Sequence, residues 1–261
     1  MTAPRVRPDD ADVRPLLDEL DAWVAAGSQA TLWWRDDDCI EPTAALDRMI
    51  GLSATYKVPL GLAVIPAHAK PALADRLAGE PTVAVLLHGF AHINHAGRGE
   101  RAAEFGAHRP VATRVAEISD GWQRLAYLPR RLPVFVPPWN RYDSDIVAGA
   151  ARVGIHVISA FGPRRSLSSG VVEANCHCDI ISWKTTRAFT GVTKSVAMIV
   201  EHLAARRNGR AAKDEVTGVL SHHLDHDEGC WTFLDTLFGL THAHPGARWV
   251  SPAHLTARTP T

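Results

Sequence analysis

A short apolar run, a polar cluster and an amphipathic stretch follow one another repeatedly along most of this chain. Short apolar runs bounded by polar residues are typical of buried strands, and longer stretches with apolar residues at helical spacing are typical of helices. Strands that alternate with helices pair in parallel through right-handed crossovers. The pattern therefore predicts an α/β fold with a parallel sheet.

About seven such units are present, a number that suits a barrel or a strongly wound sheet. The predicted strands are residues 31–34, 60–65, 83–87, 132–136, 156–160, 179–183 and 216–220, with a short final strand near 248–250. The predicted helices are residues 12–26, 43–56, 71–77, 112–125, 144–153, 194–207 and 231–240.

The composition favours one domain. With 261 residues and a hydrophobic fraction of 46%, the chain can form one sizeable core. Residues 1–28 are expected to form a helical extension packed on a barrel domain of residues 29–261.

The net charge and the search for targeting segments limit the partners and the location that we expect. Lysine plus arginine equal aspartate plus glutamate at 28 each, which argues against a nucleic-acid or membrane partner, because either would need a basic face. The chain starts without a secretory signal, and no uncharged apolar stretch approaches the roughly 18 residues of a membrane span. With only 4 cysteines besides, we expect a cytoplasmic protein.

Polar clusters follow four of the predicted strands. In βα barrels the loops after the strands share one face, and that face carries the active site. We therefore expect these clusters to converge in space. They comprise residues 35–38, 88–92, 137–141 and 221–225.

The first two clusters have the residue types of a metal site. Three consecutive carboxylates repel one another, and a nearby cation relieves that repulsion; a solvated turn that caps the next helix is the alternative. His88 and His92 are four residues apart, so both imidazoles can reach one ion if Gly89 opens a turn. Two histidines and one carboxylate leave positions open for water and substrate. Such a donor set suits zinc, cobalt, nickel, manganese or iron.

The other two clusters offer substrate contacts and proton transfer. Two prolines stiffen the loop around Trp139, whose flat face is of the kind on which sugars stack; a rigid surface loop is the alternative. His222 can donate a proton to a leaving group if a carboxylate holds its tautomer. Asp179, Asp225 and Asp227 are the candidates for that support. A second metal site or a simple polar loop are the alternatives for this cluster.

In sequence order, the aspartate run, His-x-x-x-His, the proline loop, an Asp…Trp strand and Leu-x-His resemble the polysaccharide deacetylase superfamily (NodB homology, carbohydrate esterase family 4). The likeness extends from Trp33 to about Asp227. It implies a distorted (β/α)7 TIM-like barrel that removes acetyl groups from N- or O-acetylated sugars with one divalent metal ion, zinc being expected. Because Arg-Asp-Asp-Asp-Cys replaces the family's Asp-Asp-Gly, the chain looks like a divergent branch.

The resemblance also implies residue roles. Asp37 would be the general base and His222 the general acid. Asp38, His88 and His92 would be the metal ligands, and the alternative aspartate pair is Asp36 and Asp37. Arg141 or Arg35 would orient the base, and Asp179 and Asp225 remain the candidates to orient His222. The substrate would contact Pro138, Trp139, Asn140, Arg141, Trp183 and Leu220, and the last two would enclose the acetyl methyl group.

The predicted function is therefore hydrolysis of an acetylated sugar or a related small metabolite. Two other functions compete with it. A non-catalytic sugar-binding barrel would keep the cleft without the chemistry. An iron-dependent oxygenase would use the same donor types, but those triads commonly occur on an all-β fold with a different spacing. The sequence does not indicate an oligomeric state.

Overall fold

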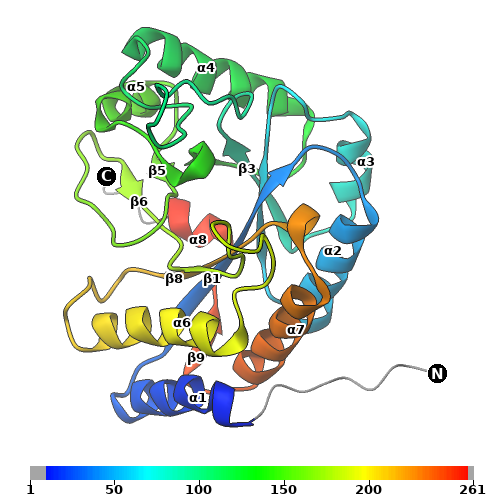
Figure 1. Ribbon diagram of the computed structural model, residues 1–261, viewed down its shortest axis with the longest axis vertical. Coiled ribbons are helices and arrows are strands. Elements are labelled where there is room, and N and C mark those ends of the chain that lie inside the picture. The colour runs from blue at the N-terminus through cyan, green and yellow to red at the C-terminus, as the bar shows by residue number, and fades with distance from the viewer. Residues whose placement is uncertain (1–9, 258–261) are drawn as a thin grey trace.

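A computed structural model describes residues 10–257 and shows a parallel sheet surrounded by helices (Figure 1). Within the described residues the strands are β1 (Ala30–Cys39), β2 (Leu60–Val64), β3 (Val83–His88), β4 (Arg131–Val136), β5 (Val157–Ile158), β6 (Val172–Glu173), β7 (Cys178–Asp179), β8 (Thr217–Ser221) and β9 (Ala247–Trp249). The helices are α1 (Asp10–Ala25), α2 (Ala44–Tyr56), α3 (Ala72–Ala78), α4 (Val111–Arg124), α5 (Val147–Arg152), α6 (Val192–Arg207), α7 (Glu228–His242) and α8 (Pro252–Thr256).

The strand order is β6-β5-β4-β3-β2-β1-β8-β7, with β9 beside β1, and every pair is parallel. One extended segment closes this sheet, because β6 pairs with β5 while β7, a few residues later, pairs with β8. Between them the backbone N–H of Cys176 donates to Ala160, and that of His177 donates to Gly218. We call this segment, residues 172–179, the closing segment. It acts as one irregular seventh strand, and the distorted (β/α)7 barrel is confirmed.

Two apolar layers surround the strands, because alternate side chains of a strand point to opposite faces. Trp33 of β1 packs inside the barrel in a cluster that includes Leu86 and Leu220. The next residue, Trp34, lies in the outer layer, where its ring centroid is 4.8 Å from that of Phe238 on α7. β1 is therefore held from both sides, and its carboxyl end is fixed in place.

The predicted elements are found at different bounds, with three corrections. The predicted strand 31–34 extends over Ala30–Cys39, so the aspartate run lies within the strand and does not follow it. The predicted strand 179–183 stops at Asp179, and the chain beyond it turns through a loop whose ends meet in an antiparallel bridge between Ile181 and Phe189. The predicted strand 156–160 is reduced to Val157–Ile158. The strand β6 and the helix α8 were not predicted, because neither is long enough to show a periodic pattern.

The amino-terminal helix α1 packs against α6 on the outside of the barrel (Figure 1). The division into an extension of residues 1–28 and a domain of residues 29–261 stays a prediction, and residues 1–9 lie outside the described part. Among residues 10–257, no helix is both long and apolar enough to cross a membrane.

Replacing Gly218 with alanine is expected to destabilise the barrel. An added Cβ would lie 2.6 Å from the Asn175 carbonyl oxygen and 2.7 Å from the Cys176 Cα, both backbone atoms of the closing segment. Urea unfolding should show a loss of about 1–3 kcal/mol in the free energy of unfolding.

Gly51→Ala is the matched control, because a Cβ at this position in α2 would meet no atom within 4 Å. It should raise the free energy of unfolding by about 0.5–1 kcal/mol. Effects of the same sign and size at both glycines would contradict the proposed role of Gly218.

Candidate active site

The three aspartates at the end of β1 have three different environments. Asp36 is fully buried, and its carboxylate accepts hydrogen bonds from the Ser221 hydroxyl at 2.7 Å and the His223 backbone N–H at 2.9 Å. The His223 Nδ1 atom lies 2.6 Å from its other oxygen. Asp36 thus ties β1 to the end of β8, while Asp37 and Asp38 line a cleft. This geometry favours Asp37 and Asp38 over the alternative pair.

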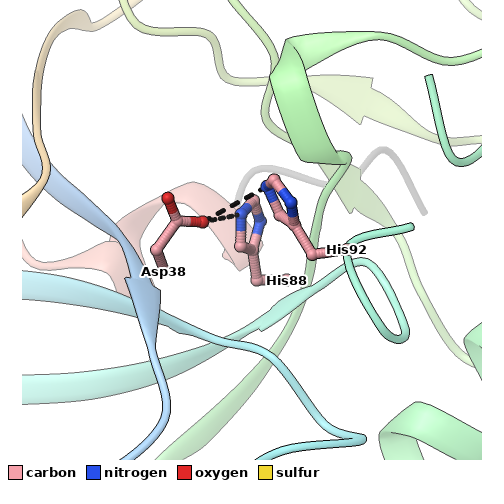
Figure 2. Close-up of side chains that lie close together, drawn as sticks. All are labelled: Asp38, His88 and His92. Carbon is pink, nitrogen blue, oxygen red and sulfur yellow. Dashed lines mark hydrogen bonds and ion pairs between the residues drawn. The ribbon is translucent and has the colours of Figure 1, made fainter. Parts of the chain in front are cut away.

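Asp38, His88 and His92 converge on one point, although they come from two strands and a loop (Figure 2). The Nε2 atoms of His88 and His92 lie 2.9 Å and 3.3 Å from the same carboxylate oxygen of Asp38. One ligand atom from each residue lies within 4.8 Å of the others. The metal triad predicted from the sequence is therefore assembled in space.

The donor atoms of this triad fit a cation. His88 Nδ1 lies 3.0 Å from the Val136 carbonyl oxygen, which can only accept, so Nδ1 carries the proton. Burial disfavours a charged ring, but the Asp37 and Asp38 carboxylates outweigh it and raise the pKa of His88, so Nε2 of the protonated ring donates to the Asp38 oxygen. A cation that took the place of this proton would find a lone pair on Nε2 and an acceptor on Asp38, and the bond to Val136 would fix the tautomer that coordination requires.

The protonation states of Asp38 and His92 suit metal binding. Burial disfavours the Asp38 carboxylate, but the hydrogen bond and charge of His88 outweigh it and hold the pKa of Asp38 well below its usual range. Burial and the neighbouring His88 lower the pKa of His92. Near neutral pH, Asp38 is therefore an anion and His92 a neutral imidazole.

Glu104, in the loop between β3 and α4, holds the turn between the two histidines. Its buried carboxylate accepts from the backbone N–H groups of Phe90 at 3.0 Å and Ala91 at 2.8 Å. Gly89 has φ +52°, and a Cβ there would lie 2.2 Å from the Glu104 carboxylate. The glycine and the buried acid together bring His92 back toward His88. A glutamate shortly after a His-x-x-x-His pattern is a weak signal for such a support.

Arg35 fixes Asp37 in the cleft. Its side chain is fully buried, and its Nε and Nη2 atoms lie 2.9 Å and 3.0 Å from the two oxygens of Asp37. The same guanidinium donates to the hydroxyl and carbonyl oxygens of Ser159 and to the Asn140 side-chain oxygen. Arg35, predicted as a residue that orients the base, therefore contacts Asp37 directly.

The proline loop reaches the cleft through a strained turn. Trp139 and Asn140 have φ +56° and +58°, in the left-handed region that non-glycine residues rarely adopt. This turn packs the Trp139 ring 4.3 Å from the His92 ring, centroid to centroid. Arg141 follows and donates to the Ala102 carbonyl oxygen.

His222 lines the same cleft, where its ring and that of Trp183 make an edge-to-face contact with centroids 4.6 Å apart. The three predicted supports differ, and Asp227 caps α7 by accepting from the Cys230 N–H at 2.9 Å. Burial raises the pKa of Asp179, against the opposing effect of His222, and its carboxylate accepts from the Trp183 indole at 2.8 Å. Asp225 instead pairs with Arg187. Within the described residues, His222 Nδ1 has no hydrogen-bond partner.

The cleft has a volume of about 920 Å³, which suits a small ligand. Trp139, Asn140, Arg141 and Trp183 line it, as predicted for substrate contacts. Leu220 does not, because strand alternation directs it into the barrel interior. Pro138 is buried against Gly89 and is also absent from the lining.

A second histidine pair lies elsewhere, where buried His177, His202 and Glu215 meet. The Gly218 N–H donates to His177 Nδ1, so Nε2 carries the proton and faces Glu215 at 3.2 Å. The two rings stack with centroids 3.3 Å apart and 11° between their planes. A metal lies in the plane of each ring that binds it, and nearly parallel planes share no such point. This cluster is therefore a hydrogen-bonded support.

Solved structures share this fold. A protein from Mycobacterium smegmatis named as a polysaccharide deacetylase is 14% identical with a TM-score of 0.60, and the match covers 100% of this chain and 96% of that one. A family 4 carbohydrate esterase from Streptomyces lividans in complex with acetate is 14% identical with a TM-score of 0.52, over 85% and 98% of the chains. A family 4 pseudoenzyme from Bacillus anthracis is also 14% identical with a TM-score of 0.52, over 87% and 65%.

These likenesses confirm, at the level of fold, the resemblance predicted from the motifs, and the low identities fit a divergent branch. Comparison with family models and with curated proteins gave no match.

Glu104→Gln is expected to weaken zinc binding about tenfold, because the amide NH2 cannot accept from the backbone N–H groups that the carboxylate now holds. Competition with a chromogenic chelator measures the affinity. Glu100→Gln is the control, since this exposed carboxylate of the same loop accepts from Gly97 and pairs with His108, not with His88 or His92. Equal losses in both variants would contradict a special role for Glu104.

Acid is expected to destabilise the fold between about pH 6.5 and pH 4. Burial lowers the pKa of His177 and His226 from 6.5 to about 4. Within this window the unfolded chain binds protons that the folded chain does not, so the free energy of unfolding falls as the pH falls.

In His177→Gln, the number of protons taken up on unfolding within this window should fall by about one. The pH dependence of the free energy of unfolding, measured in urea, gives this number. His242→Gln, at an exposed histidine of α7, is the matched control. A slope that His177→Gln leaves unchanged would rule out this explanation.

Proposed function

We propose that this chain is a metal-dependent hydrolase that removes an acetyl group from an N- or O-acetylated sugar or a related small molecule. The observation that carries the proposal is the convergence of Asp38, His88 and His92 in one cleft that Asp37 and His222 also line. The fold shared with family 4 esterases supports it. The cytoplasmic location stays a prediction.

Asp38, His88 and His92 would hold a divalent ion, for which we propose zinc. When bound, such an ion polarises a carbonyl oxygen and makes a bound water more acidic. Two histidines and one carboxylate leave positions for water and substrate on the ion, as catalytic sites require.

Asp37 would act as the general base by taking a proton from the attacking water. Its two oxygens face Arg35 Nε and Nη2, which fixes the plane of the carboxylate. Because Arg35 is buried and bound to Ser159 and Asn140 as well, it cannot turn away. The base is thus positioned before substrate arrives.

His222, which lines the same cleft, would protonate the departing amine or alcohol. The Trp183 ring packs on it and limits its rotation. The same tryptophan, with Ile181 and Met198, gives the cleft an apolar surface for the acetyl methyl group. This assignment replaces Leu220, which lies in the barrel core.

A non-catalytic sugar-binding barrel is the second candidate. The observation that favours it is that one protein of this fold is named a pseudoenzyme. It differs from the first candidate in one respect, because it predicts that ligand binding survives the loss of Asp37.

Purified protein is expected to hold about one equivalent of a divalent metal. Asp38→Ala and His88→Ala should lose both the metal and acetate release from acetylated sugars or 4-nitrophenyl acetate. Asp37→Asn and His222→Ala should retain the metal and lose about 10²–10⁴-fold in kcat. Asp75→Asn, at an exposed aspartate of α3, is the control.

Each outcome has a distinct meaning. Metal binding without acetate release from any acetylated sugar or ester would sink the enzyme proposal and favour the binding barrel. Full activity in Asp37→Asn or His222→Ala would remove that residue from the mechanism. Absence of metal after exposure to zinc and cobalt would exclude the site itself.

A further inference from the structure

Cations from separate segments line the cleft. Arg101 lies in the loop between β3 and α4, and Arg141 follows the proline loop. Lys184 lies in the loop after β7, and Lys194 lies in the first turn of α6. We call these four residues the basic wall. Segments far apart in sequence thus place the same charge on one cavity.

The carboxylates of the cleft are already paired with other groups. Asp37 is bound by Arg35, and Asp38 by the two histidines. Asp225 pairs with Arg187, and Asp179 accepts from the Trp183 indole. None of them neutralises the basic wall.

Within residues 10–257, no member of the basic wall forms a salt bridge with a carboxylate. Arg141 donates only to the Ala102 carbonyl oxygen. Burial and the positive charge of Arg101 both lower the pKa of Arg141, so the two guanidinium groups repel each other. An anion between them would relieve that repulsion.

We propose that the substrate carries, besides its acetyl group, a negatively charged phosphate or carboxylate that binds Arg101, Arg141, Lys184 and Lys194. The proposal rests on the proposed deacetylase function for the acetyl end of the molecule. A cavity of about 920 Å³ has room for a sugar with one such group.

Calorimetric titration of the zinc-loaded protein tests the proposal with three probes. N-acetylglucosamine is neutral, N-acetylglucosamine 6-phosphate carries a phosphate, and N-acetylmuramic acid carries a carboxylate. At low salt we expect at least one anionic probe to bind about tenfold or more tightly than the neutral one. The preference should shrink in 0.5 M salt, because exposed charges are screened.

The triple variant Arg101→Gln, Lys184→Gln, Lys194→Gln should reduce the preference to about threefold or less. These three side chains are exposed, so the changes leave the core intact. Lys213→Gln, at an exposed lysine that precedes β8 at the other end of the barrel, is the matched control. Comparing the ratio of two Kd values within one variant cancels any general change in the cleft.

Two results would overturn the proposal. One is equal affinity for neutral and anionic probes in the wild type. The other is a preference that the triple variant retains, since the anion would then bind the zinc ion or another surface. Acetate release from 4-nitrophenyl acetate, measured on the same samples, tests the deacetylase function separately. Activity without anion preference leaves that function standing, and anion preference without activity leaves the basic wall standing.

Discussion

The buried guanidinium of Arg35 is the interaction on which the rest of the site depends. A cation with no access to water is costly unless every donor has a partner. Arg35 offsets this cost through its ion pair with Asp37 on its own strand and its hydrogen bonds to Ser159 after β5 and Asn140 after β4. It therefore joins β1 to two loops at the carboxyl end of the barrel. The proposed base acquires its position from the same contacts that hold this end of the fold together.

Much of this arrangement could be predicted from the sequence, because chemistry and periodicity agreed. Each polar cluster directly followed an apolar run, so parallel pairing alone brought them to one face. His88, His92 and Asp38 meet for that reason. The sequence did not decide whether the site uses Asp36 and Asp37 or Asp37 and Asp38. Neighbouring residues of a strand point to opposite faces, but the sequence does not tell which face Asp36 takes. Asp38 has φ +71°, a backbone conformation that no sequence pattern predicts.

The contributions that sequence reasoning missed depend on contacts between distant residues. Glu104 is one acid among many in the sequence, and its role appears only where the backbone N–H groups of Phe90 and Ala91 gather around it. Leu220 was misplaced for a related reason. An apolar leucine side chain suits an acetyl pocket, but the strand register directs Leu220 inward to Trp33. The closing segment showed no long apolar run, because it pairs for only two residues with each neighbouring strand.

Because the closing segment pairs only briefly with its neighbours, the cleft has two parts that can change independently in evolution. Asp37, Asp38 and His88 belong to β1 and β3, long strands with neighbours on both sides. Trp183 and Lys184 follow the closing segment, where few backbone bonds depend on the identity of any side chain. Substitutions or insertions there can reshape one wall while the reactive groups keep their geometry. A lineage with this barrel can thus exchange one acylated substrate for another by altering a single loop.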